Sequence, residues 1–179
     1  MSHLLYFIYR MFISFLFVSI FLSSIIAQEA IIYDGKIEYE HNLSAFKELM
    51  KNINTYFLDT TLEKIQISNY YSNEFVFYSY PAGEKKGVVT SKVDYINGFN
   101  QMKQLGMSLS IDHCVYLPGL DKVSYTIDGS VRVYYGATLS ANGKDVGFSG
   151  YQTIDFEQGK ILAIWEWADY GGLQNQLLK

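Results

Sequence analysis

The sequence predicts an α+β fold in which helices come first and a long antiparallel sheet follows. In the N-terminal half, apolar residues recur every three or four positions, which is the spacing of amphipathic helices. From residue 107 onward, long stretches with strand character are separated by turn signals such as Asn142-Gly143 and Gln158-Gly159. Glycines inside these stretches indicate bends, so we expect the sheet to curve around the helices and enclose a cavity.

Composition limits the classes of function. The chain has 179 residues, of which 49% are hydrophobic and 17% aromatic, enough for one domain with a substantial core. A net charge of -4 without a basic cluster argues against binding nucleic acid. The single cysteine, Cys114, excludes an internal disulfide framework and a multi-cysteine zinc site, and the three histidines are too scattered for a metal site. We therefore predict no metal and no cofactor.

The N-terminus predicts export. An apolar run from Met11 to Ile26 follows Arg10 and ends at Ala27, the pattern of a secretory signal peptide over residues 1–27. The alternative is an uncleaved membrane anchor over residues 4–26. The expected location is periplasmic or extracellular, and membrane contact is expected only through an uncleaved N-terminal segment. Residues 28–41 are expected to form a lead-in, either an edge strand or a tether, before the folded domain of residues 42–179.

Three helices are expected before the sheet. The first spans residues 42–57, with Asn42 or Ser44 as its cap; Asn42 also begins a glycosylation acceptor sequence, for which the cap is the preferred interpretation. The second spans residues 60–70 behind a capping box of Thr60 and Glu63. The third begins at Ser91 and ends at Gly106. Its buried side is predicted to comprise Val93, Ile96, Phe99 and Met102, with Gly98 packed closely against a neighbouring element.

Five strands are predicted around these helices. The first covers residues 73–80, with Phe75, Phe77 and Ser79 on one face. A second, residues 107–117, ends at Pro118-Gly119. The last three, residues 129–141, 144–156 and 160–169, are expected to form an antiparallel meander, after which Asp169 caps a short tail helix.

This order of elements resembles the nuclear transport factor 2-like superfamily, which includes SnoaL-type polyketide cyclases and ketosteroid isomerase. The resemblance covers residues 42–178 and is carried by three stretches: NEFVFYSYP, SKVDYINGF and GYQTIDFEQGKILAIWEWADYGGLQNQL. It implies a cone-shaped, cystatin-like α+β barrel, in which a curved antiparallel sheet wraps around the N-terminal helices. It also implies a pocket between sheet and helices, usually in a homodimer, but no single chemistry.

Limonene epoxide hydrolase, a member of this superfamily, gives a sharper comparison because its last hairpin aligns with this one. The aspartate on its last strand falls on Glu166, so a carboxylate is kept. Its Arg-x-Asp pair falls on Val133 and Tyr135, and its water-holding tyrosine and asparagine fall on Phe77 and Ser79. Epoxide hydrolysis by that mechanism is therefore not expected.

The resemblance places Glu166 and Tyr135 as candidate catalytic residues, a carboxylate base and a hydroxyl donor for work beside a carbonyl group. In an apolar wall the pKa of Glu166 would be raised; the alternatives are that Glu166 pairs with a lysine or a helix end, or faces outward. Tyr135 could equally be a core tyrosine with a satisfied hydroxyl. The candidate ligand-binding residues are Phe77, Ser79, Val133, Phe148, Gln152 and Ile164.

Other chemically suggestive residues have plainer interpretations. Asp112 and His113 are adjacent on a strand, so they point to opposite faces and at most one can line the cavity. Trp165 and Trp167 are expected on the convex face, as dimer-interface residues. Cys114 is expected to be a buried small hydrophobic residue.

Three functions remain open. The first is an exported domain that binds a small, apolar or carbonyl-containing molecule without chemistry. The second is a cyclase- or isomerase-type enzyme that uses Glu166 as general acid or base. The third is a non-catalytic dimerisation or interaction module, whose cavity would be filled by Phe77, Phe148 and Tyr135.

Overall fold

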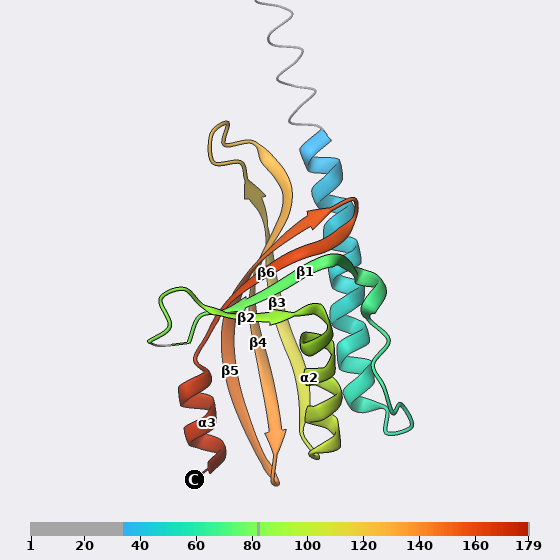
Figure 1. Ribbon diagram of the computed structural model, residues 1–179, viewed down its shortest axis with the longest axis vertical. Coiled ribbons are helices and arrows are strands. Elements are labelled where there is room, and N and C mark those ends of the chain that lie inside the picture. The colour runs from blue at the N-terminus through green and yellow to red at the C-terminus, as the bar shows by residue number, and fades with distance from the viewer. Residues whose placement is uncertain (1–33, 82, 179) are drawn as a thin grey trace, which may run out of the picture.

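The computed structural model describes residues 34–81 and 83–178, so the predicted leader, residues 1–27, lies outside the described residues. The strands are β1 (Tyr71–Ser79), β2 (Val88–Ser91), β3 (Ser108–Leu120), β4 (Ile127–Ala141), β5 (Lys144–Glu157) and β6 (Lys160–Ala168). They form one sheet in the order β2-β1-β6-β5-β4-β3. Figure 1 shows the helices of residues 34–58 and 92–104 side by side against this curved sheet, which confirms the α+β class.

The C-terminal half of the sheet is the antiparallel meander that the turn residues predict, and β3 extends it by one strand. Asn142 and Gly143 both have positive φ, 54° and 75°, and so do Gln158 and Gly159, 51° and 73°. These backbone conformations match the twist of the flanking strands. The sheet is mixed rather than wholly antiparallel, because β1 pairs in parallel with β6.

The N-terminal helix occupies residues 34–58 and is longer than predicted. The expectation that residues 28–41 form a strand or tether is wrong for residues 34–41, which are helical. The buried stripe continues backward through Asn42 to Tyr39, but a polar residue at position 42 hides it from a hydropathy pattern. Asn42 is no cap: it is 1% exposed, which also excludes glycosylation in this fold, and its Nδ2 donates to the Gly129 carbonyl at 3.0 Å.

The helix predicted at residues 60–70 is wrong, since only the single 3₁₀ turn η1 (Ser68–Tyr70) forms there. Asp59 Oδ1 accepts from the Thr61 amide at 2.9 Å, and Asn100 Oδ1 accepts from the Ile65 amide at 3.0 Å. These side chains satisfy backbone donors without a helix. Ile65 and Ile67 are both buried, with the two-residue spacing of an extended segment.

Helix α2 (Lys92–Gln104) begins and ends close to the predicted positions. The Ser91 hydroxyl caps the Asp94 amide, and Gly106 follows the helix with φ 73°. Two details of its faces differ from the prediction. Val93 is 66% exposed, and a Cβ added at Gly98 would meet no atom within 4 Å, so Gly98 faces open space instead of a close neighbour.

The strands differ from the prediction in two respects. β2 was not predicted and pairs with the end of β1, from Val76 opposite Ser91 to Ser79 opposite Val88. β3 does not stop at Pro118 but continues to Leu120 through a register shift against β4. Proline is tolerated because β3 is an edge strand, where an amide donor is not needed on the open side.

The core lies between the helices and the concave face of the sheet. Phe46, Leu49 and Ile53 from the N-terminal helix pack with Val131, Ile154 and Ile161 from the strands. Helix α3 (Tyr170–Leu178) closes the lower end of the sheet in Figure 1, and Leu173 packs with Leu139 and Val146. As predicted, Asp169 caps α3, with Oδ1 accepting from the Gly172 amide at 2.8 Å. Within residues 34–81 and 83–178, no helix is both long and apolar enough to cross a membrane.

Candidate functional site

A cavity of about 400 Å³ lies between the concave sheet and the helices. The N-terminal helix and α2 supply one wall, strands β3 to β6 and β1 the other, and α3 one edge. Most of its wall is apolar, including Phe46, Ile53, Phe99, Val133, Ala137 and Phe148. The volume suits a small organic molecule. Because the cavity is open, Phe77, Phe148 and Tyr135 line it but do not fill it.

Glu166 is the central polar group of the wall and is 6% exposed. Its Oε1 accepts a hydrogen bond from the Tyr135 hydroxyl at 2.7 Å and another from Gln152 Nε2 at 2.5 Å. Among the described residues no group donates to Oε2, and no basic side chain forms an ion pair with Glu166. One carboxylate oxygen is therefore fixed by the sheet, and the other has no donor among the described residues.

Strand register brings the side chains of Glu166, Gln152 and Tyr135 together. Gln152 lies directly opposite Glu166 across β5 and β6, and Val133 lies opposite Gln152 across β4 and β5. Tyr135 is opposite Gly150, where a Cβ would collide with the tyrosine ring. Gly150, predicted as a bend, thus leaves room for the ring to cross β5 and for its hydroxyl to reach Glu166.

Burial controls the pKa values of Glu166 and Tyr135. Loss of hydration raises the pKa of the Glu166 carboxyl above its ordinary value, and the hydrogen bonds from Tyr135 and Gln152 oppose that rise. Burial, and then the negative charge of Glu166, raise the pKa of Tyr135, which keeps its hydroxyl protonated as a donor. The geometry can therefore hold either a carboxylate or a neutral carboxylic acid in contact with the cavity.

The predicted ligand-binding residues divide into two groups. Phe77, Val133, Phe148 and Gln152 line the cavity together with Glu166 and Tyr135. Ile164 does not: it is 1% exposed and belongs to the hydrophobic core. Ser79 does not line it either, although it is opposite Glu166 in the pairing of β1 with β6.

Tyr95 lines the cavity and is absent from the sequence-based candidates. Its ring packs against Phe77 at 4.7 Å and Phe99 at 5.3 Å between centroids. Burial raises its pKa most, and the charge of Glu166 contributes to that rise. The sequence contains a signal for this face, since Tyr95, Gly98, Phe99 and Met102 have helical spacing, but the predicted stripe runs through Val93 and misses Tyr95.

The remaining candidates lie at the edge of the cavity or outside it. Neither Asp112 nor His113 lines it: both are exposed, and Asp112 accepts from the Thr138 hydroxyl at 2.8 Å. Cys114 is half-buried and lines the cavity beside Ile111. No group of three or more metal-ligating side chains is placed to hold a metal among the residues that the structure describes.

The outer face of the sheet carries a row of aromatic rings. Trp165 stacks on Tyr78 with centroids 5.5 Å apart, and Trp167 stacks on Tyr80 at 4.8 Å. Tyr151 continues the row beside Trp167 at 5.8 Å. Trp167 remains 43% exposed, so this face presents apolar surface to solvent.

Solved structures share this fold, while no protein-family profile and no curated protein sequence matches the chain. Bal32a, from a soil-derived mobile gene cassette, superposes with a TM-score of 0.55 at 13% identity, over 79% of this chain and 99% of its own. A putative polyketide cyclase from Xanthomonas campestris gives 0.55 at 11% identity, over 79% and 97%. A limonene-epoxide-hydrolase-like epoxide hydrolase from M. tuberculosis gives 0.53 at 14% identity, over 79% and 92%. At these identities the likeness concerns the fold alone.

Proposed function

We propose that this chain, whose fold is the nuclear transport factor 2-like cone, binds a small and largely apolar molecule in the cavity between sheet and helices. The observation that carries the proposal is a wall of mainly apolar side chains that converges on one hydrogen-bonded carboxyl group. A binding cavity needs apolar surface for affinity and a few fixed polar groups for orientation. The apolar part of the ligand contacts Tyr95, Phe99 and Phe148, and its polar group contacts Glu166 Oε2.

A second candidate is a cyclase- or isomerase-type enzyme in which Glu166 transfers a proton beside a carbonyl group. The raised pKa of Glu166 favours it, because a carboxyl that titrates closer to neutral pH both accepts and returns a proton. The hydroxyl of Tyr135 is already donated to Glu166, so Tyr135 orients the base. We assign the substrate carbonyl to Tyr95, which lines the same cavity from α2. A filled cavity would favour the interaction-module alternative, and this cavity is open.

Titration with the neutral fluorescent probe N-phenyl-1-naphthylamine tests the binding proposal. Gly98→Leu places a side chain into the cavity from a position where a Cβ meets nothing, so we expect probe affinity to fall at least tenfold. Val93→Leu, on the exposed face of the same helix, is the matched control and should bind like the wild type. Equal affinity in both variants would place the probe elsewhere and remove the proposal.

Glu166→Gln separates binding from catalysis. Glutamine keeps a hydrogen-bonding side chain at this position but cannot take up a proton from a substrate. If the chain only binds, affinity for the probe should survive the substitution. If it is an enzyme, turnover of a carbonyl substrate found by screening should fall by at least a hundredfold, with circular dichroism confirming that the variant folds.

We also propose that the chain forms a homodimer through the aromatic outer face of the sheet. Exposed tryptophan and tyrosine on the outer face of a sheet are typical of interface cores. Trp167→Lys should shift the mass measured by light scattering from dimer to monomer. Val93→Lys, which changes an exposed apolar residue on α2, should leave the mass unchanged. A monomeric wild-type protein would contradict the proposal.

A further inference from the structure

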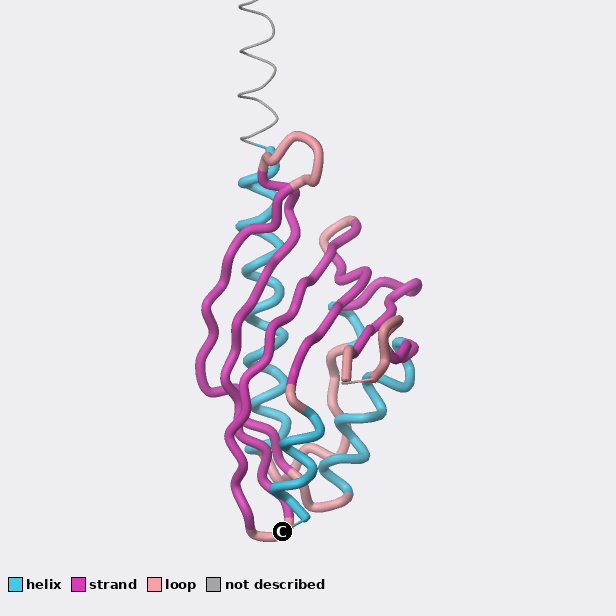
Figure 2. Tube along the Cα trace, turned by 90° about the vertical axis from the view of Figure 1, so that its left-hand side faces the viewer, coloured by secondary structure: helices cyan, strands magenta, loops and turns pink. Residues whose placement is uncertain are grey.

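The connection between β3 and β4, residues 121–126, exposes apolar side chains at one end of the molecule. Val123 and Tyr125 are each 76% exposed, and Leu120 at the base of the loop is 53% exposed. The loop lies at the tip of the β3–β4 hairpin, at the end of the molecule opposite to α3 (Figures 1 and 2), and none of its residues lines the cavity. They contribute nothing to the candidate site, so their exposure needs another explanation.

The loop is held in one conformation by its own hydrogen bonds. Asp121 Oδ1 accepts from the amides of Val123 at 2.9 Å and Ser124 at 2.7 Å. The Asp121 amide donates to the Thr126 carbonyl at 2.8 Å, and the Tyr125 amide donates to the Asp121 carbonyl at 2.9 Å. Tyr125 has a left-handed backbone conformation, φ 57°, that is unfavourable for a residue with a side chain. A fixed backbone therefore presents the two apolar side chains outward.

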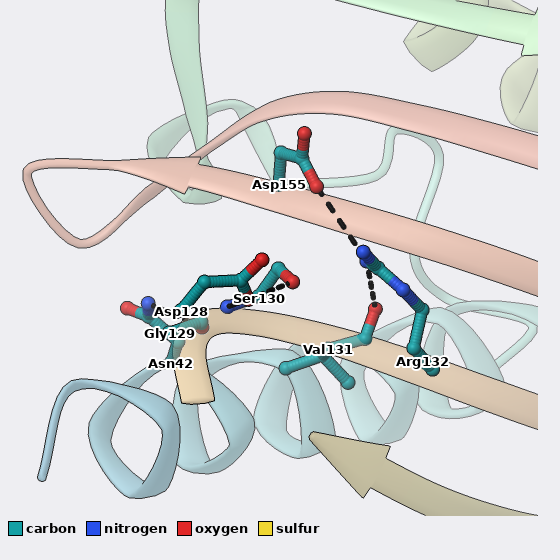
Figure 3. A network of polar contacts seen from close by, with 7 residues as sticks. All are labelled: Asn42, Asp128, Gly129, Ser130, Val131, Arg132 and Asp155. Carbon is teal, nitrogen blue, oxygen red and sulfur yellow. Dashed lines mark hydrogen bonds and ion pairs between the residues drawn. The ribbon is translucent and has the colours of Figure 1, made fainter. Parts of the chain in front are cut away.

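The start of the N-terminal helix lies beside the base of this loop. A Cβ at Gly35 would collide with the Ile127 carbonyl, and the Glu38 side chain lies over Gly129. Figure 3 shows Asn42 beside Gly129 and Ser130, where Asn42 donates to the Gly129 carbonyl at 3.0 Å. Both views place the loop and the helix start at the same end of the molecule. The start of the described chain is thus held beside the loop.

The preceding sequence contains the apolar run Met11 to Ile26, and residues 4–26 are long enough to cross a bilayer if they are not removed. From Ala27 to Asp34 the chain can extend by at most about 25 Å. An anchor in this run would therefore hold the loop end of the domain close to the membrane surface. Tyrosine is favoured at that interface because its ring is apolar and its hydroxyl reaches water.

We propose that residues 120–126 are a membrane-surface contact, which works together with an uncleaved N-terminal anchor to orient the domain on a phospholipid bilayer. Leu120, Val123 and Tyr125 enter the headgroup region. The carboxylates of Asp34, Glu38, Asp121 and Asp128 outnumber the two lysines of these segments, Lys36 and Lys122. This acidic excess opposes an anionic surface, so the partner is a neutral, zwitterionic lipid surface. In this orientation α3 and the hairpin turn at Asn142 point away from the membrane (Figure 1).

Spin labelling of the full chain in phosphatidylcholine nanodiscs tests this contact. Cys114→Ala removes the only thiol, and a nitroxide is then attached at Val123→Cys or, as the control, at Lys144→Cys on the opposite hairpin. We expect the label at position 123 to collide at least threefold more often with oxygen, relative to a water-soluble nickel reagent, than the label at position 144. Circular dichroism of both labelled proteins checks that each retains the fold.

Two results would overturn the proposal. The first is the same aqueous accessibility at positions 123 and 144 in folded protein. The second is cleavage after Ala27, read from the N-terminus of the exported chain, because the domain would then lose its tether. Neither result bears on probe binding in the cavity, so the proposed function is tested separately.

Discussion

Gly98→Ala is predicted to stabilise the protein. Gly98 lies inside α2, its backbone is not left-handed, and an added Cβ would have no atom within 4 Å. In a helix interior alanine is favoured over glycine by about 1 kcal/mol, because glycine loses more backbone entropy on folding. No steric cost opposes this gain at Gly98. The expected increase in the free energy of unfolding is about 1 kcal/mol, which raises Tm by about 2–4 °C for a chain of this size.

Urea and thermal unfolding, followed by circular dichroism, measure this difference, and Gly106→Ala is the matched control. Gly106 also has no atom within 4 Å of an added Cβ, but its φ is 73°. Alanine there should therefore destabilise the protein by about 1–2 kcal/mol. The two substitutions are expected to act in opposite directions. A loss of stability in Gly98→Ala would show that α2 packs closely at this point and that the cavity does not reach it.

Three further predictions concern the Glu166 carboxyl, the hydrogen bonds between Asn54 and Ile111, and the cap of α3. Burial raises the pKa of Glu166 in the folded state, so its contribution to stability is full below the unfolded pKa, about 4.3, and is lost as pH rises through the folded pKa. Glu166→Gln should lack this loss, and urea titrations between about pH 4 and pH 8 should show the variant gaining on the wild type as pH rises. Asn54→Ala should cost about 2 kcal/mol of unfolding free energy by equilibrium urea titration, because Asn54 accepts from the Ile111 amide at 2.8 Å and donates to the Ile111 carbonyl at 3.1 Å. Asp169→Ala should cost about 1 kcal/mol in the same assay through loss of the α3 cap, and Asp169→Asn, which retains a cap, should recover most of it.

Local chemistry explains why most of the sheet could be predicted. The left-handed turns at Asn142-Gly143 and Gln158-Gly159 require residues that tolerate positive φ, and such residues are rare inside strands. Once these turns are placed, the side chains that face inward follow, because successive side chains of a strand point to opposite faces of the sheet. Phe148, Gln152 and Glu166 accordingly line one wall. β2 has only four residues and leaves no comparable pattern.

The failures arise where a distant side chain replaces a local hydrogen bond. Asn42 is polar, yet it is buried because its partner is the Gly129 carbonyl, which is remote in sequence. The segment after Asp59 has helical capping residues, but Asn100 of α2 accepts from its Ile65 amide, and Lys103 donates to the Asp59 carbonyl just before it. Likewise, the contact between Tyr135 and Glu166 depends on the space above Gly150. No spacing rule in a single sequence reveals such partners.

The cavity wall contains two features that oppose stability. Gly98 weakens α2 by about 1 kcal/mol relative to alanine, and Glu166 is buried without a cation among the described residues. A ligand that binds only the folded state offsets both, by about 2.7 kcal/mol at a concentration one hundred times its Kd. Saturating N-phenyl-1-naphthylamine should therefore raise the Tm of the wild type and of Val93→Leu. Gly98→Leu, in which a side chain occupies part of the cavity, should show little or no rise. An equal rise in all three proteins would mean that the probe stabilises the fold from outside the cavity.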